Sequence, residues 1–342
     1  MKGSKLSKTL LASGLAVSLL LVLPFVAATQ AEQYPSKPIR WIVPYSPGGG
    51  FDVYSRAVAR YLPKYLPGKK KVDVIIQTVT GAGGTVGVTK VYNSKPDGHT
   101  VGIMNTIGVC AATVLGEAGL KVAALKFDVR ELTFLGVITE NIYCLCVGKD
   151  SPYKSVKDLQ NAKEVKFPTT GVGSSEWSHT VLVADEMGIK ARHVAGYSGS
   201  TPSRLSVVAG DTDAIMATVG SAWAQIQAGD LTPIFYIKPA KEYFPEAPDR
   251  PTAQELGYPN LVKFCGFWRH VIAPPGLPED RAKILEDALW NVIQDPEFRA
   301  WAEKTHRPII FPAKAKEAKE TVVELIDTLK QRANVFKAAI EH

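Results

Sequence analysis

Residues 39–62 read IRWIVPYSPGGGFDVYSRAVARYL, and this stretch decides the fold class. The apolar run Ile39–Val43 predicts a strand that ends at a proline, and three consecutive glycines follow it. Apolar residues spaced four apart then predict a helix over Asp52–Leu62. Glycines between a strand and a helix leave backbone N–H groups open, and the helix N-terminus adds partial positive charge. Such a turn favours an anion, and we expect Asp52 to cap the helix.

Strand and helix patterns alternate along the rest of the chain and predict an α/β fold with parallel sheets. A further strand is predicted over Phe264–Ala273, and the C-terminal region is predicted to hold a helix from about Ala315 to Phe336. Turn signals at Ser151-Pro152 and Pro274-Pro275-Gly276 indicate an inserted second domain, with two strands crossing between lobes.

The first 31 residues have the pattern of a secretory signal peptide. Three lysines precede the apolar run Leu10–Val26, and small residues follow, with cleavage expected near Ala31. An uncleaved membrane anchor is the alternative. Without the three lysines, 37 basic and 33 acidic residues remain, a net charge of +4 (37 minus 33). The basic runs lack interleaved aromatic residues, so nucleic-acid binding is not indicated.

The four cysteines are Cys110, Cys144, Cys146 and Cys265, and we expect them to be buried thiols. A Cys144–Cys265 or Cys146–Cys265 disulfide is the alternative in an oxidising compartment. The six histidines have no metal-ligand spacing, so we expect neither a metal nor a cofactor. No motif assembles a nucleophile, a base or a metal, which argues against an enzyme.

Two more glycine-rich turns repeat the design of the first one. Thr80–Thr85 reads TGAGGT and Thr169–Ser175 reads TTGVGSS, and each lies between a predicted strand and a predicted helix. None of the three contains a dinucleotide fingerprint or a P-loop. Three anion-type turns in one chain predict a binding site for a negatively charged ligand, although plain tight turns would have the same composition.

The chain resembles the periplasmic substrate-binding proteins of tripartite tricarboxylate transporters, the Bug family. The resemblance covers nearly all of the sequence after the signal peptide, in one order. It rests on the following stretches: YPSKPI at 34–39, PGGGFD at 47–52, GAGG at 81–84, PDGHT at 96–100, GVGS at 171–174, GYSG at 196–199, GDTDA at 210–214 and PTAQELGYP at 251–259.

The resemblance implies a two-lobed periplasmic binding protein fold, type II-like, with a hinge and a cleft between the lobes. We expect residues 32–149 to form the first part of lobe 1, 150–265 to form lobe 2, and 266–342 to return to lobe 1. The expected role is capture of a small carboxylic acid by a monomer for integral membrane permease subunits. A periplasmic ligand sensor that feeds a signalling protein is the alternative, and a periplasmic enzyme acting on carboxylates is a third class.

The resemblance also implies which residues bind the ligand, largely through backbone amides of two lobe 1 loops and groups of lobe 2. The expected residues are Ser46, Gly48, Gly49, Gly50, Phe51, Asp52, Gly81, Ala82, Gly83, Gly84, Thr85, Asn105, Thr170, Gly171, Gly173, Ser174, Ser175, Trp177, Tyr197, Ser198 and Gly199.

Two positions depart from the family pattern. Phe51 stands where a small residue is frequent, and Trp177 stands where many members carry His. Both changes add aromatic bulk near the expected cleft. They predict a ligand with one carboxylate and an apolar or aromatic body, with Trp177 as a wall of the cleft; the alternative is that both rings pack within the lobes.

Overall fold

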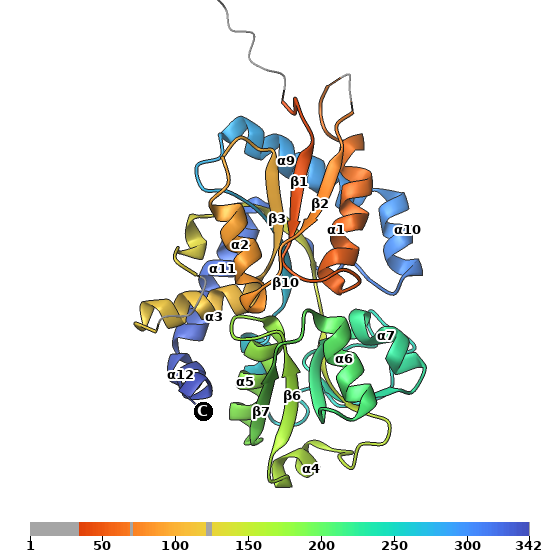
Figure 1. Cartoon of the computed structure of the whole chain (residues 1–342). Coiled ribbons are helices and arrows are strands. Elements are labelled where there is room, and N and C mark those ends of the chain that lie inside the picture. The colour runs from red at the N-terminus through yellow and green to blue at the C-terminus, as the bar shows by residue number, and fades with distance from the viewer. Residues whose placement is uncertain (1–33, 69–70, 121–124, 342) are drawn as a thin grey trace, which may run out of the picture. The chain divides into compact units, whose positions relative to one another are not determined.

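The computed structural model describes residues 34–68, 71–120 and 125–341 (Figure 1). The predicted signal peptide lies outside these described residues. Strands and helices alternate in the first part, in the order β1 (Ile39–Val43), α1 (Gly50–Tyr61), β2 (Val74–Thr78), α2 (Thr85–Tyr92) and β3 (Thr100–Asn105). In the part of the chain that the structure describes, no helix has both the length and the apolar character needed to cross a bilayer.

A five-stranded sheet has the order β2-β1-β3-β10-β4, in which β4 is Thr133–Glu140 and β10 is Trp268–Ala273. β1 is parallel to β2 and β3, but β10 is antiparallel to β3 and β4. The prediction of parallel sheets is therefore wrong here, and this sheet is mixed. The reason is that the chain leaves the sheet along β4 and returns along β10, so these neighbours run in opposite directions.

The other described strands form two smaller groups. β5 (Tyr143–Gly148) lies between β8 (Ala214–Thr218) and β9 (Leu231–Tyr236) and is antiparallel to both. β6 (Val165–Thr169) and β7 (Ala191–Ala195) form a parallel pair. β5 follows β4 closely in sequence, yet the two strands belong to different sheets, so the chain changes sheet between them.

The lobe boundaries remain predictions, and the strand pairing favours an earlier position for the first of them. Because β5 pairs with β8 and β9, we propose that the chain crosses between the lobes at Asn141–Ile142, before residue 149. The Asn141 backbone N–H donates to the Phe267 carbonyl at 2.8 Å. The outgoing and returning segments therefore lie side by side, and we propose them as the hinge.

Helices pack against these sheets: α1 contacts β1 and β2, and α2 contacts β1 and β3. Two C-terminal helices, α9 and α11, contact β4. The bounds of the remaining helices are α3 Thr106–Glu117, α4 Val156–Asn161, α5 Ser175–Met187, α6 Ser200–Ala209, α7 Val219–Gln227, α8 Asn260–Phe264, α9 Glu279–Gln294, α10 Pro296–Lys304, α11 Ala315–Lys330 and α12 Ala333–Glu341.

The helices differ from the sequence-based expectation in three places. α3 is not predicted from the sequence, because its first ten residues are all buried and give no amphipathic period. The predicted strand over Phe264–Ala273 begins only at Trp268, after α8 has ended at Phe264. The long C-terminal helix is two helices, α11 and α12, whose separation lets Phe336 become fully buried.

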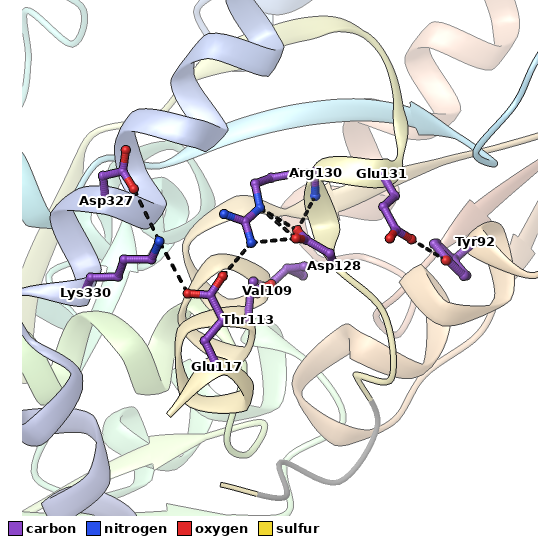
Figure 2. Close-up of polar contacts among 9 residues, drawn as sticks. All are labelled: Tyr92, Val109, Thr113, Glu117, Asp128, Arg130, Glu131, Asp327 and Lys330. Carbon is purple, nitrogen blue, oxygen red and sulfur yellow. Dashed lines mark hydrogen bonds and ion pairs between the residues drawn. The ribbon is translucent and has the colours of Figure 1, made fainter. Parts of the chain in front are cut away.

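A group of charged side chains joins α3 to α11 (Figure 2). Arg130 contacts Asp128 and also Glu117 of α3. On α11, Lys330 Nζ lies 3.4 Å from Glu117 Oε2. These side chains are partly exposed, so each pair contributes about 1 kcal/mol or less. Together they help to fix α3 against α11.

The four cysteines are free and buried in the structure. Neither of the two alternative disulfides to Cys265 is formed. Cys144 and Cys146 point to the same side of β5, with their Sγ atoms 3.3 Å apart. Burial raises the pKa of the Cys110 and Cys265 thiols well above the usual range, so these groups stay protonated.

Candidate functional site

A small cavity lies among the N-terminal turns of α1, α5 and α6 and the strands β8 and β10. About 30 Å³ of it can be reached by the centre of a water molecule. Its lining comes from segments far apart in the sequence: Tyr45, Gly49, Gly50, Phe51, Tyr143, Thr170, Ser175, Glu176, Ser200, Arg204, Met216, Ala217, Thr218, Ser221, Phe267 and Arg269.

The side chain of Arg269, on β10, is the most unusual feature of this cavity. It is 1% exposed, and its guanidinium carbon lies 4.6 Å from the ring centre of Phe51, 4.7 Å from that of Tyr54 and 5.2 Å from that of Phe267. Nη2 lies 3.4 Å from Asn141 Oδ1, while Nε and Nη1 have no hydrogen-bond partner. A buried guanidinium with free donors is costly unless something binds to it.

The charge of Arg269 is also unbalanced. Burial lowers its pKa to about 10, so the guanidinium remains charged at neutral pH. In the described part of the chain, its electrostatic neighbours are tyrosine side chains and Arg307, with no carboxylate among them. Stacking on aromatic faces stabilises such a cation but does not neutralise it. An anion bound in the cavity would balance this charge.

The three consecutive glycines, two of which line this cavity, differ in what surrounds them. Gly48 has φ +83° and donates its N–H to Asp52 Oδ2 at 3.0 Å. A Cβ on Gly49 would lie 3.2 Å from Ser200 Oγ. A Cβ on Gly50 would lie 2.4 Å from Arg269 Nη2 and 2.8 Å from Ser221 Oγ. The third glycine therefore makes room for the guanidinium.

The N-terminus of α1 differs in detail from the expectation. The N-cap residue is Gly49 rather than Asp52, which lies in the first turn. The Asp52 carboxylate accepts from Gly48, as above, and from Arg56 Nε at 2.9 Å. Asp52 is thus engaged in fixing the glycine turn and does not line the cavity.

Two side chains of opposite charge, Glu176 and Arg204, also line the cavity. Glu176 follows the N-cap Ser174 in the first turn of α5, where a helix N-terminus favours an acidic residue. It is 6% exposed and accepts from Ser203 Oγ at 3.3 Å. Burial raises the pKa of Glu176 to about 7, and the positive charge of Arg204 opposes that rise.

Arg204 is also almost fully buried, at 5% exposed. Its Nη2 lies 3.4 Å from Thr201 Oγ1, and its Nε and Nη1 have no partner. Burial lowers the pKa of Arg204, while the Glu176 carboxylate raises it. Each of these two side chains therefore favours the charged form of the other.

Hydroxyls and apolar groups complete the lining. Thr218 Oγ1 donates to Ser221 Oγ at 2.8 Å and caps α7. The Phe51 ring stacks on Tyr45, with 4.8 Å between ring centres, and contacts Phe267 edge to face at 5.7 Å. A ligand here would meet a cationic group and hydroxyls on some sides and aromatic rings on others.

The second glycine turn lines a different hollow of about 270 Å³, together with Tyr197 and Ser198. A Cβ on Gly83 would lie 2.4 Å from the backbone nitrogen of Ser174, so the turns at 81–84 and 171–174 touch directly. Asn105 Nδ2 lies 2.8 Å from both Tyr45 Oη and the Gly173 carbonyl. Nδ2 also lies 3.2 Å from the Gly83 carbonyl, so this amide bridges the two turns and has little capacity left for a ligand.

The structure thus divides the expected site residues into three groups. Those in the cavity are Gly49, Gly50, Phe51, Thr170 and Ser175. Those in the second hollow are Gly81, Ala82, Gly83, Gly84, Tyr197, Ser198 and again Thr170. Those in neither are Ser46, Gly48, Asp52, Thr85, Asn105, Gly171, Gly173, Ser174, Trp177 and Gly199.

Trp177 lies elsewhere than expected. Its side chain is 2% exposed, and its ring stacks on Phe336 of α12 with 5.6 Å between ring centres. It belongs to the packing of α5 against α12 and not to the wall of the cavity. The inference about ligand shape that rested on this ring is therefore dropped, whereas Phe51 does line the cavity.

The charged residues of the cavity are not among the expected ones. Arg269 carries a usable signal, since a charge within the predicted strand Phe264–Ala273, followed there by His270 and an apolar run, is costly without a partner. Glu176 directly follows the third glycine turn. Arg204 has no comparable signal. The other lining residues outside the expected set are Tyr45, Tyr143, Ser200, Met216, Ala217, Thr218, Ser221 and Phe267.

Among the described residues, no group of three or more His, Cys, Asp or Glu side chains is arranged to hold a metal ion.

The chain is similar to proteins of one family. A model described as "Tripartite tricarboxylate transporter family receptor" matches residues 57–337. A protein of Agrobacterium vitis, named for the TAR-I ttuE-ttuC' intergenic region, is 29% identical over 280 residues, which cover 80% of this chain and 76% of that protein. BugT of Bordetella pertussis is 28% identical over 290 residues, which cover 83% and 85%.

Solved structures show the fold. MatC from Rhodopseudomonas palustris with bound malate superposes with a TM-score of 0.74 at 22% identity, over 89% of this chain and 100% of that one. An R. palustris protein with adipate gives 0.75 at 20% identity, over 89% and 98%. The periplasmic binding protein BugD gives 0.73 at 21% identity, over 90% and 98%. The fold is the two-lobed α/β fold of periplasmic binding proteins.

Proposed function

Since this chain belongs to the tripartite tricarboxylate transporter receptor family, we propose that it captures a small organic acid and presents it to a secondary transporter. The family consists of periplasmic solute-binding receptors, not of enzymes. The proposal includes export with cleavage near Ala31, action as a monomer, and the integral membrane permease subunits of a tripartite transporter as partner.

One observation carries the choice of ligand. The buried guanidinium of Arg269 presents two unpartnered nitrogens, Nε and Nη1, in a cavity, and within the described chain no carboxylate is among the neighbours that shift its pKa. A carboxylate can accept a charge-assisted hydrogen bond from either of these nitrogens and neutralise the charge of the guanidinium. The neighbours crystallised with malate and adipate hold carboxylic acids, which supports the same class of ligand here.

The test is a thermal-shift screen of small carboxylic acids on the protein that starts at residue 32, followed by titration calorimetry. A ligand that binds only the folded state raises its melting temperature. We expect the best acid to bind, and its primary amide and methyl ester to bind at least about a hundredfold more weakly, since a charged hydrogen-bonded pair is lost. Equal affinity for the acid and its amide would contradict the proposal.

A further inference from the structure

We propose that the cavity is selective for monocarboxylates over dicarboxylates, and that Glu176 is the residue that sets this preference. This inference rests on the proposed function and narrows its ligand class. It follows from the charges that line the cavity, the space between them and the donors left without partners.

The charges of the lining leave room for a single negative charge. Arg204, Arg269 and Glu176 are the charged residues among those that line the cavity. At pH 8 Glu176, whose pKa is about 7, is ionised, so the lining carries two positive charges and one negative charge, a sum of +1 (2 minus 1). One ligand carboxylate at Arg269 makes the buried site neutral, which is the least costly state for charges removed from water.

A second carboxylate on the ligand would be unfavourable. Only about 30 Å³ is open to the centre of a water molecule, so both ends of a ligand stay close to the walls and retain little water. A carboxylate near Arg204 would also lie near Glu176, which accepts from Ser203, the residue before Arg204, and like charges repel strongly in a poorly solvated site.

A neutral polar group suits the same place better. Arg204 Nε and Nη1 have no partner, and a hydroxyl, keto or amide oxygen can accept from them without adding charge near Glu176. The ligand class is therefore a short monocarboxylate with a neutral acceptor at its other end. An ammonium group at Glu176 is the competing arrangement, and it would leave Arg204 without its balancing charge.

A matched set of four-carbon acids separates these arrangements. Succinamate and succinate have nearly the same shape but carry one and two negative charges, and 4-aminobutyrate carries an ammonium instead of the amide. We expect wild-type protein at pH 8 to bind succinamate at least about tenfold more tightly than succinate or 4-aminobutyrate. Succinate or 4-aminobutyrate binding as tightly as succinamate would overturn the inference.

Glu176→Gln tests the residue itself. The variant should reduce the preference for succinamate over succinate by about tenfold, since it removes the repelling charge. The control is Glu279→Gln, which makes the same change at an exposed position in the first turn of α9 and should leave the preference unchanged. A preference that is the same in Glu176→Gln and wild type would overturn the assignment.

Circular dichroism and the melting temperature establish whether Glu176→Gln is folded. If it is not, the affinities of wild-type protein for the three acids test the selectivity by themselves. The proposed function fails in a distinguishable way, namely when no carboxylate of the set or of the wider screen binds to wild type. In that case the selectivity has no basis either.

Discussion

Gly50 shows how one missing Cβ can serve a binding site. Gly48 has a positive φ, and a Cβ on Gly49 would lie next to Ser200. A Cβ on Gly50 would instead collide with Arg269 Nη2. The neighbouring atom is the far end of a long side chain, which can shift at small cost. A substitution here should therefore disturb the guanidinium more than the fold.

We predict that Gly50→Ala lowers affinity for the best acid by at least about tenfold, or about 1.4 kcal/mol, while stability changes by about 1 kcal/mol or less, since Ala suits a helix better than Gly. Titration calorimetry and chemical denaturation measure the two effects. Gly116→Ala in α3, where a Cβ meets nothing within 4 Å, is the control and should not change affinity. If Gly50→Ala bound the acid with normal affinity, the observed position of the Arg269 guanidinium would not be required for binding.

The titration of Glu176 should make the stability of the protein depend on pH. Its pKa is about 7 in the folded protein and near 4.5 in an unfolded chain. Between these values the folded state binds more protons than the unfolded state, so stability falls as pH rises through this range. The full cost, on the order of 3 kcal/mol, is present above pH 7 and absent below about pH 4.5.

We therefore expect Glu176→Gln, which resembles the protonated side chain, to gain stability relative to wild type as pH rises from 5 to 8. Urea denaturation of both proteins across this range measures the difference, and other titrating groups cancel in the comparison. A difference that stays constant with pH would show that Glu176 does not titrate there.

At the scale of elements, the position of α12 explains why Trp177 is not in the cavity. Trp177 is in the first turn of α5, but its ring is covered by Phe336 from the other end of the sequence. His193 also lies beside it, with 6.1 Å between ring centres. The ring therefore stabilises the docking of α12 on α5.

Trp177→Ala should destabilise the protein by about 3–5 kcal/mol, as for other buried aromatic residues, and should leave ligand affinity within about twofold at temperatures where the variant is folded. Denaturation and calorimetry on the same sample provide both values. Loss of affinity without loss of stability would show that Trp177 contributes to ligand binding rather than to packing.

How far the sequence predicts these elements depends on what surrounds them. The strand, glycine turn and helix from Ile39 to Tyr61 are predictable, because turn chemistry and apolar spacing are local signals. α3 is not, since it is buried on all sides. The lining of the cavity by Arg269, Glu176 and Arg204 is not predictable from spacing either, because β10, α5 and α6 meet only in the folded chain. Family resemblance supplied the fold but not these charges.

At the scale of the whole molecule, ligand capture requires that the lining segments separate and meet again. Gly83 lies against Val172 and Ser174, with no room for a Cβ, so this contact belongs to a compact arrangement. We propose that the segments at Asn141–Ile142 and Phe267 act as the hinge for this motion. Ligand would then shift the population toward the compact state.

Gly83→Val should prevent this compact state, since its Cβ would meet backbone atoms that cannot move away cheaply. Small-angle scattering with saturating acid should show contraction of wild type and no contraction of the variant. Contraction of both proteins to the same extent would separate the Gly83 contact from closure.

The central claim is that Arg269 receives the carboxylate of the ligand. A crystal structure of the protein with the best acid from the screen tests it most directly. We expect a carboxylate within hydrogen-bond distance of Arg269 Nη1 or Nε, the two nitrogens that lack partners. A carboxylate held instead in the hollow between Gly81–Gly84 and Tyr197–Ser198, with both Arg269 nitrogens still unpartnered, would contradict it.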